Sequence, residues 1–150
     1  GRACKVEGKL QTLTVAALDK NLPAVNDFIH SSIESYSPSQ EVLLALDLAV
    51  EELFVNVAHY AYAPDTGDIS VTCSVSAGQQ PVLSVSFSDS GVPYNPLLRP
   101  DPDLTQKLED RRIGGMGIYL TKKYMDGIAY TYIKGKNIVT ITKALKPSNK

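Results

Sequence analysis

The sequence predicts an α+β fold, a two-layer sandwich in which a mixed, mostly antiparallel sheet carries three main helices on one face. Apolar residues recur at helical spacing in three segments, while five other segments have the composition of strands. These segments follow one another in the order β-α-α-β-β-loop-α-β-β. Two pairs of neighbouring strands favour antiparallel hairpins, and helices packed on one face of the resulting sheet complete the sandwich.

The first part of the chain is expected to hold a strand and a helix. Residues 9–15 are rich in Leu, Thr and Val, a composition typical of a strand. A helix is expected over 21–36, where Pro23 lies near the start. Its apolar residues follow helical spacing and predict one buried face: Val25, Phe28, Ile29 and Ile33.

The second helix has the clearest pattern. Ser37 or Ser39 can cap its N-terminus, and Glu41 lies in its first turn. Apolar residues recur at steps of three and four and define one face: Val42, Leu46, Ala49, Val50, Leu53 and Val57. We expect this helix to end at about His59 or Tyr60, because turn-forming residues follow.

Four further strands are expected to pair as two hairpins. They span 69–76, 82–88, 128–133 and 138–145. The turn of the second hairpin, 134–137, contains the glycine that such turns require. Between the hairpins we expect a long Pro-rich loop over 89–112, with one short helix around 104–108, and then a helix over 118–125.

Composition and charge limit the class of protein. The chain has 150 residues, of which 43% are hydrophobic and 21% charged, so one compact domain over 1–150 is expected. Lys plus Arg number 15 against 16 Asp plus Glu, and this balance excludes a domain that binds nucleic acid mainly by neutralising phosphates. The longest mainly apolar stretch, 42–57, contains three carboxylates and is not expected to span a membrane.

The two cysteines, Cys4 and Cys73, match no metal-binding or redox spacing. Unpaired cysteines are typical of a reducing compartment, so we expect a cytoplasmic protein. The first residues of the sequence lack the apolar segment of a secretory leader, and this agrees with that expectation.

Three polar residues form a stripe on the second helix. Glu52, Asn56 and His59 are spaced by four and three residues and therefore share one face. A carboxylate can polarise a water or a hydroxyl, and an amide oxygen can bind a hard cation such as Mg²⁺. Taken alone, the stripe favours a solvated polar face. However, the neighbouring Phe54 and Val55 are apolar, so the helix is expected to be buried on most sides and its polar groups then need partners.

A second candidate motif, the segment 88–93 (Ser-Asp-Ser-Gly-Val-Pro), comes directly after an expected strand. The carboxylate of Asp89 at a strand end can accept a hydrogen bond from an exocyclic amine, as adenine recognition requires. Gly91 would let the backbone turn close to a ligand. By itself, Asp-x-Gly is a common turn, and a turn is the favoured interpretation.

The third motif is the segment 114–117 (Gly-Gly-Met-Gly), which precedes the helix expected over 118–125. Glycine N–H groups and the N-terminus of a helix together form a cradle for phosphate. Arg111 and Arg112 lie just upstream and could pair with phosphate oxygens. The alternative is a flexible loop that enters a helix, since the segment matches neither a P-loop nor a dinucleotide-binding fingerprint.

Taken in order, the three motifs closely resemble the N, G1 and G2 boxes of the GHKL ATPase superfamily. The boxes are Glu52-x-x-x-Asn56-x-x-His59, Asp89-x-Gly91-x-Pro93, and Gly115-Met116-Gly117 before a helix. Within the superfamily, the compact size and the stretch over 52–62 look most like the RsbW-type anti-sigma factors, which are serine kinases. The resemblance covers residues 10 to 145 and implies the Bergerat fold of these ATPases.

The resemblance implies a role for each matching residue. Glu52 would be the general base that activates the acceptor hydroxyl, and Asn56 would hold Mg²⁺. Asp89 would bind the adenine amine, with Gly91 allowing close approach. The remaining nucleotide-binding residues would contact the phosphates: Arg112, Gly115, Met116, Gly117 and Ile118.

Other parts of the site are less determined by the resemblance. A lid over 97–114 would cover the phosphates, and either arginine of the doublet at 111–112 could reach them. Tyr94 and Asn95 could alter the edge of the site. His59 would support the site from one turn beyond Asn56, and a histidine packed at a helix end is the alternative.

The resemblance implies a serine/threonine protein kinase that uses ATP, releases ADP and requires Mg²⁺. It would phosphorylate a serine on a STAS-type anti-sigma antagonist and otherwise sequester a sigma factor, and relatives of this type often form homodimers. The alternative is a catalytically weak, nucleotide-gated binding module of the same fold. A histidine-kinase fragment is less favoured, because no dimerisation helix is recognised ahead of residue 10.

Overall fold

The computed structural model describes residues 10–76, 78–98 and 115–146. Within this part of the chain, five strands form one sheet in the order β1-β2-β3-β5-β4. The strands are β1 (Gln11–Ala16), β2 (Asp68–Val75), β3 (Val82–Asp89), β4 (Gly127–Ile133) and β5 (Lys136–Ala144). Their four pairings are all antiparallel, whereas the sequence predicts a mixed, mostly antiparallel sheet.

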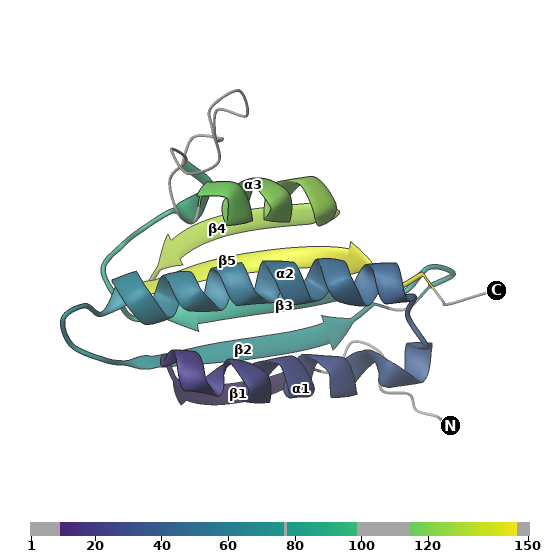
Figure 1. Ribbon diagram of the computed structural model, residues 1–150, viewed down its shortest axis with the longest axis horizontal. Helices are drawn as coiled ribbons and strands as arrows, with labels where there is room; N and C mark the ends of the chain where they lie inside the picture. Colours follow the sequence, from purple (N-terminus) through teal and green to yellow (C-terminus); the bar gives the residue numbers. More distant parts are fainter. Residues whose placement is uncertain (1–9, 77, 99–114, 147–150) are drawn as a thin grey trace.

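The α-helices of the described residues pack on one face of this sheet (Figure 1). They are α1 (Leu22–Ile33), α2 (Gln40–Asn56) and α3 (Gly115–Tyr124). α2 runs along the middle of the sheet, α1 packs against β1 and β2, and α3 packs against α2 and overlaps β4 in this view. The predicted α+β two-layer sandwich is therefore confirmed.

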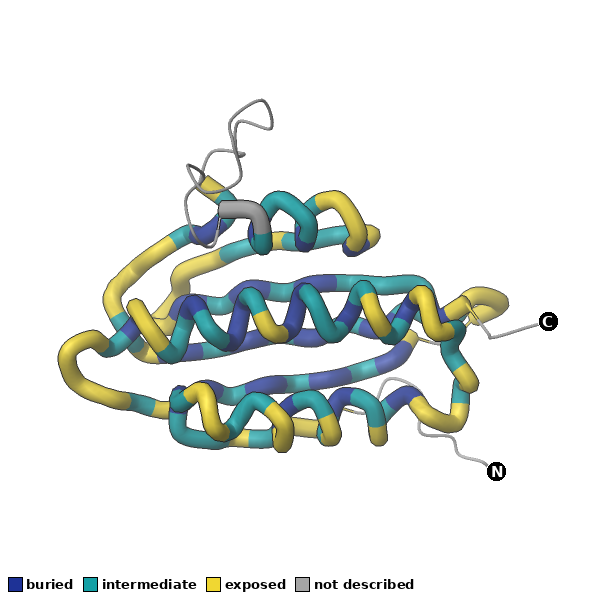
Figure 2. The backbone as a smooth tube through the Cα atoms, viewed as in Figure 1, coloured by how far each residue is buried: buried dark blue, intermediate teal, exposed yellow. Residues whose placement is uncertain are grey.

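The hydrophobic core lies between the helices and the sheet. Along β2 and β3 every second residue is buried (Figure 2), and the inward side chains include Val71, Val85 and Phe87. α2 contributes its predicted apolar face together with Phe54: Val42, Leu46, Ala49, Val50, Leu53 and Phe54. Burying a large apolar side chain stabilises the fold by about 1.5–3 kcal/mol, so this face anchors α2 firmly on the sheet. The polar residues near the C-terminal end of α2 are therefore held in a defined position.

Hydroxyl side chains cover the opposite face of the sheet. Six of the outward residues in β2 and β3 carry hydroxyls: Ser70, Thr72, Ser74, Ser84, Ser86 and Ser88. Hydroxyl pairs join neighbouring strands at Thr14–Ser70 (2.8 Å) and Ser86–Thr140 (2.8 Å). Since side chains alternate between the two faces, the register that buries the apolar set places the hydroxyls on the other side.

Among the helix boundaries that differ from the prediction, two lie near the candidate site residues. α3 begins at Gly115, three residues before the expected start, so Gly115, Met116 and Gly117 form its first turn instead of a loop. α2 is α-helical only to Asn56 and continues as a π-helical turn, η3 (Val57–Ala61). In both places, packing against a neighbouring element overrides local propensity.

The caps and turns resolve the alternatives left open by the sequence. Ser39, and not Ser37, caps α2, because the Val42 N–H donates to Ser39 Oγ at 3.2 Å. Ser37 instead has a left-handed backbone (φ 49°) after the short helix η2 (Glu34–Tyr36). The turn between β4 and β5 is tighter than predicted and consists of Lys134 and Gly135.

The expected short helix around 104–108 lies outside the described residues, and so does most of the predicted lid. Only 97 and 98 of the lid are described, in the short helix η4 (Pro96–Leu98). Among the described helices, none combines the length and the apolar character needed to cross a membrane.

Candidate functional site

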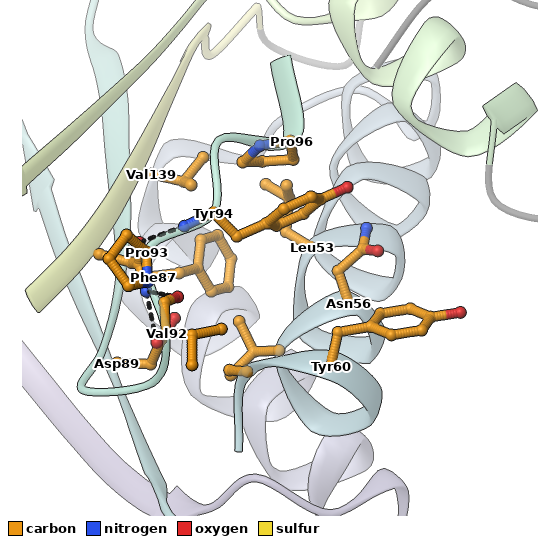
Figure 3. Close-up of a pocket in the computed structure, with 13 residues that line it drawn as sticks. Leu53, Asn56, Tyr60, Phe87, Asp89, Val92, Pro93, Tyr94, Pro96 and Val139 are labelled. Atoms are coloured by element: carbon orange, nitrogen blue, oxygen red, sulfur yellow. Dashed lines mark hydrogen bonds between the residues drawn. The ribbon is translucent and has the colours of Figure 1, made fainter. Parts of the chain in front are cut away.

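A cavity of about 140 Å³ opens beside the C-terminal end of α2. α2 and η3 form one side, and the ends of β3 and β5 and the segment 92–96 form the others (Figure 3). Much of the lining is apolar, including Leu53, Phe87 and Val139. The polar side chains of the lining are Asn56, Tyr60, Asp89, Tyr94 and Asn137. An apolar cavity with a few convergent polar groups is typical of a site for a small organic ligand.

Asp89, the last residue of β3, is a polar group of this cavity and is only 6% exposed. Its Oδ1 accepts hydrogen bonds from the Gly91 N–H at 2.8 Å and from Asn137 Nδ2 at 3.0 Å. No donor in the described part of the chain binds Oδ2. The carboxylate therefore keeps one acceptor oxygen for an N–H group of a ligand.

Asn137 holds the loop that follows β3. It lies near the start of β5, directly opposite Asp89 in the strand register. Besides Asp89, its Nδ2 donates to the Val92 carbonyl at 2.8 Å, and its Oδ1 accepts from the Tyr94 N–H at 3.0 Å and the Tyr130 hydroxyl at 2.5 Å. From the sequence, Asn137 is expected only as part of a turn, because no local pattern marks a single buried amide.

Glu52 and Asn56 are joined, as their shared helix face predicts. Asn56 Nδ2 donates to Glu52 Oε2 at 2.9 Å and to the Glu52 carbonyl at 2.9 Å. These bonds orient the Asn56 amide with its Nδ2 toward Glu52. No described residue donates a hydrogen bond to Asn56 Oδ1. Because Asn56 lines the cavity and Glu52 lies one turn before it, the pair extends the site along α2.

The Glu52 carboxylate lies against the first turn of α3. A Cβ atom added at Gly117 would lie 1.9 Å from Glu52 Oε1, so no side chain fits at residue 117 unless Glu52 moves. The first four N–H groups of a helix have no acceptor within the helix, and in α3 they belong to residues 115–118. The carboxylate and these N–H donors are thus neighbours, although 63 residues separate Gly115 from Glu52 in the sequence (115 − 52).

Gly91 makes a close approach, but to protein backbone. A Cβ atom at this position would lie 2.2 Å from the carbonyl oxygen of Ala61, and the Val92 N–H donates to the same oxygen at 3.1 Å. The contact holds the loop after Asp89 against η3. A contact between Gly91 and a nucleotide stays a prediction.

His59 does not support the cavity as predicted. Its Nε2 lies 2.8 Å from Asp19 Oδ2, in the short helix η1 (Asp19–Asn21), and its side chain is about half exposed. The physical reason is the π-helical turn, whose i→i+5 bonding rotates residues after Asn56 away from their α-helical positions. His59 therefore joins η3 to η1.

Some predicted site residues cannot be placed from side-chain contacts. Arg111, Arg112 and Gly114 lie outside the described residues, so their predicted phosphate contacts stay predictions. Ile118 has a side chain buried in the core, which leaves only its backbone N–H for a ligand. Tyr94, named as a residue at the edge of the site, does line the cavity together with Tyr60.

The donor set fits Mg²⁺ that arrives with a nucleotide. No three His, Cys, Asp or Glu side chains of the described residues gather into a metal site. Asn56 Oδ1 can supply one oxygen ligand beside the cavity. Mg²⁺ typically takes one or two protein ligands and completes its shell with phosphates and waters, so one amide oxygen is adequate.

Comparisons with known proteins give a family and several similar proteins. The histidine kinase-like ATPase domain family matches residues 15–143. The serine/threonine-protein kinase BtrW of Bordetella bronchiseptica is 26% identical over 112 residues, which cover 74% of this chain and 77% of BtrW. The serine-protein kinase RsbW of Listeria monocytogenes is 28% identical over 106 residues, which cover 67% of this chain and 66% of RsbW.

A solved structure shares the fold. The crystal structure of the RsbU and RsbW domains of a Mycobacterium tuberculosis protein is similar over 93% of this chain, with a TM-score of 0.64 and 14% identity. This chain spans 34% of the length of that protein. At this identity the similarity supports the fold and no finer conclusion.

Proposed function

Since the chain belongs to the histidine kinase-like ATPase domain family, we propose that it is a single ATP-binding domain that acts as a protein serine/threonine kinase. The observation that carries the proposal is the convergence of Asp89 and Asn56 on one cavity, with Glu52 hydrogen-bonded to Asn56. The similarity to two relatives that are named as serine kinases supports the same activity.

The cavity would bind the adenine base. Oδ2 of Asp89 would accept a hydrogen bond from the exocyclic amine, while Leu53, Phe87 and Val139 would contact the apolar ring. The phosphates would then extend along α2 toward the first turn of α3, where the N–H groups of residues 115–118 and the positive end of the helix dipole favour negative charge. Gly91 and Arg112 would complete the nucleotide contacts.

Glu52 would act as the general base of phosphoryl transfer. As the acceptor hydroxyl oxygen forms a bond to the γ-phosphorus, its proton passes to the Glu52 carboxylate, and the bond between the γ-phosphorus and the β–γ bridging oxygen breaks to release ADP. Asn56 orients Glu52 through its Nδ2. Mg²⁺ bound at Asn56 Oδ1 would supply neutralisation of the phosphate charge.

The acceptor that we propose is a serine of a STAS-type anti-sigma antagonist. In the absence of that antagonist, the chain would sequester a sigma factor, as a monomer or a homodimer. This finer proposal rests on the resemblance of the three motifs to the RsbW-type anti-sigma factors, and the serine kinases among the relatives support it.

Calorimetric titration with ATP and ADP tests the nucleotide site. With Mg²⁺ present, the wild type should bind both nucleotides, and Asn56→Ala should weaken binding by about 10–100-fold, as expected on loss of a metal-coordinating interaction. Chelation of Mg²⁺ should weaken wild-type binding and have little effect on the variant. A wild type that binds neither nucleotide would contradict the proposal.

A second experiment isolates the transfer step. Glu52→Gln keeps an oxygen for the Asn56 hydrogen bond but removes the base, so phosphate transfer from labelled ATP to a STAS-type partner should fall by about 10²–10⁴-fold. ATP affinity should not fall, because the substitution removes a negative charge beside the expected phosphates. Transfer at the wild-type rate would contradict the role of Glu52.

One observation favours the alternative, a nucleotide-gated binding module. Two apolar side chains of the segment beside the cavity are exposed, Val92 at 63% and Leu98 at 79%, and a partner protein could cover them. Under this alternative, ATP controls partner binding and Glu52→Gln leaves that control intact. The transfer assay therefore separates the two functions.

A further inference from the structure

We propose that Asn137, held in orientation by Tyr130, is a positioning residue that makes the cavity prefer a purine with an amino group at C6 over a purine with a carbonyl at C6. The inference rests on the proposed nucleotide site, and it identifies the residues that determine which base the site accepts. Neither residue belongs to the three sequence motifs. Tyr130 does not line the cavity.

The Asn137 side chain is the centre of a buried hydrogen-bond network. It is 4% exposed and lies opposite Asp89 across the β3–β5 pairing. Nδ2 faces Asp89 Oδ1 at 3.0 Å and the Val92 carbonyl at 2.8 Å, both of which are acceptors. A buried amide whose donors and acceptor are all bonded has one stable orientation.

The Tyr94 N–H sets that orientation because it can only donate, and the Tyr130 hydroxyl reinforces it by donating to the same oxygen. The Tyr130 hydroxyl and the Tyr94 N–H both donate to Asn137 Oδ1, at 2.5 Å and 3.0 Å. If the amide rotated by half a turn, its NH₂ group would face the Tyr94 N–H, and its oxygen would face the Asp89 carboxylate. Donor would then oppose donor and acceptor would oppose acceptor, which is costly in a buried place.

The orientation of Asn137 fixes what Asp89 offers to a ligand. With Oδ1 bonded to Asn137 Nδ2 and to the Gly91 N–H, Oδ2 remains as an acceptor without a donor among the described residues. An amino group at C6 of a purine can donate to such an oxygen. In the pose that this contact sets, a carbonyl at C6 places a second acceptor opposite Oδ2, so the two oxygens repel each other and the base must shift before its N1–H can donate instead.

Removing the Tyr130 hydroxyl tests this chain of contacts without touching the cavity. In Tyr130→Phe, Asn137 loses one of the two donors that orient it, and Asp89 is then less strictly held. We expect the ratio of the Kd for inosine triphosphate to the Kd for ATP to be about tenfold or more in the wild type and to fall to within about threefold in the variant, as loss of one buried hydrogen bond predicts.

Tyr132→Phe is the matched control. Tyr132 lies two residues along the same strand, opposite Asn137 in the β4–β5 register, and is 44% exposed. The substitution removes the same hydroxyl from a residue that has no bond to Asn137 within the described residues, so the Kd ratio should stay at the wild-type value. Asn137→Ser provides a second test that removes the amide itself and should also lower the ratio.

The Kd values for both nucleotides separate the outcomes. A purely structural role for Tyr130 would weaken ATP and inosine triphosphate binding by the same factor, and this result would overturn the inference. So would an unchanged ratio in both Tyr130→Phe and Asn137→Ser, or a wild type that binds the two nucleotides equally well. A wild type that binds neither nucleotide would overturn the proposed function as well, so the two failures are distinguishable.

Discussion

Gly117 lets α3 approach Glu52 of α2 closely. Its backbone lies so close to the Glu52 carboxylate that an added Cβ atom would be 1.9 Å from Oε1. Thr121 closes the same turn by donating from Oγ1 to the Gly117 carbonyl at 2.8 Å. The glycine therefore positions the proposed base beside the first turn of α3, in addition to any contact of its own with phosphate.

We predict that Gly117→Ala disturbs activity more than stability. Overpacking typically costs about 1–3 kcal/mol, while replacing Gly by Ala in a helix gains about 1 kcal/mol, so the free energy of unfolding should fall by at most about 2 kcal/mol. Displacement of Glu52 should slow phosphate transfer by more than tenfold. Lys123→Ala, on the exposed side of α3, is the control. Transfer at the wild-type rate in Gly117→Ala would show that Glu52 adapts without loss.

Cys73 gives a prediction about pH. Burial raises the pKa of its thiol from an ordinary 9.0 to about 11, against a smaller lowering by the hydrogen bond with Ser32. The folded state holds this proton more tightly than the unfolded state does. The contribution of the thiol to the free energy of unfolding is therefore fully present below pH 9 and is lost as the pH rises toward 11. The loss should reach about 2–3 kcal/mol, at 1.36 kcal/mol for each pKa unit.

Urea unfolding at several pH values between 8 and 11 measures this loss, with Cys73→Ala as the comparison. The difference in unfolding free energy between the two proteins should shrink across this range, since only the wild type carries the thiol. A constant difference would contradict the raised pKa. Because the thiol is protonated at neutral pH, we also expect Cys73 to react slowly with thiol reagents until the protein unfolds.

At the scale of elements, α2 carries both the core and the site, so its N-terminal cap contributes to the stability of both. The Ser39 hydroxyl accepts from the Val42 N–H at the start of the helix. We predict that Ser39→Ala lowers the free energy of unfolding by about 1 kcal/mol. Ser37→Ala, two residues earlier and without a capping bond among the described residues, should change it by less. Equal effects in denaturant titrations of the two variants would contradict the assignment of the cap.

The end of α2 matters as much as its start. The π-helical turn η3 places the Ala61 carbonyl against Gly91, and this contact fixes the loop that follows Asp89. The same turn rotates His59 to Asp19 and leaves Tyr60 at the cavity. An α-helical continuation would distribute these residues differently, so the shape of the cavity depends on a departure from regular helix geometry.

At the scale of the whole molecule, the site joins parts of the chain that are far apart in sequence, and a bound nucleotide should therefore stabilise the entire domain. At a ligand concentration of about 100 times the Kd, binding adds about 2.7 kcal/mol, which corresponds to a rise in Tm of roughly 5–10 °C for a domain of this size. Thermal unfolding with and without Mg²⁺ and ATP measures this shift.

Asp89→Asn supplies the comparison for that measurement. The amide keeps the size of the side chain but offers one acceptor oxygen in place of two, and that oxygen is needed for the bonds from Gly91 and Asn137. We predict that the ATP-induced shift falls below about 2 °C in this variant, because the base then loses its acceptor. A shift as large as that of the wild type would exclude Asp89 from base binding.

Much of the fold and part of the site follow from the sequence alone. The spacing of apolar residues in α2 and the alternation along β2 and β3 determine which faces are buried, since these periods are properties of the helix and the strand. The three motifs also predict Glu52, Asn56 and Asp89 as site residues, and the structure places Asn56 and Asp89 at one cavity, with Glu52 bonded to Asn56. The buried faces and the motifs were predictable because each depends on residues within about a dozen positions of one another.

Only the tertiary structure decided the contacts between motifs. The β3–β5 register brings Asn137 to Asp89, the packing of α3 on α2 brings Gly117 to Glu52, and η3 turns His59 toward Asp19. Each contact joins residues that are at least 40 positions apart, as between Asp19 and His59 (59 − 19). Local pattern carries no information about such distances, because they depend on how the strands and helices pack against one another.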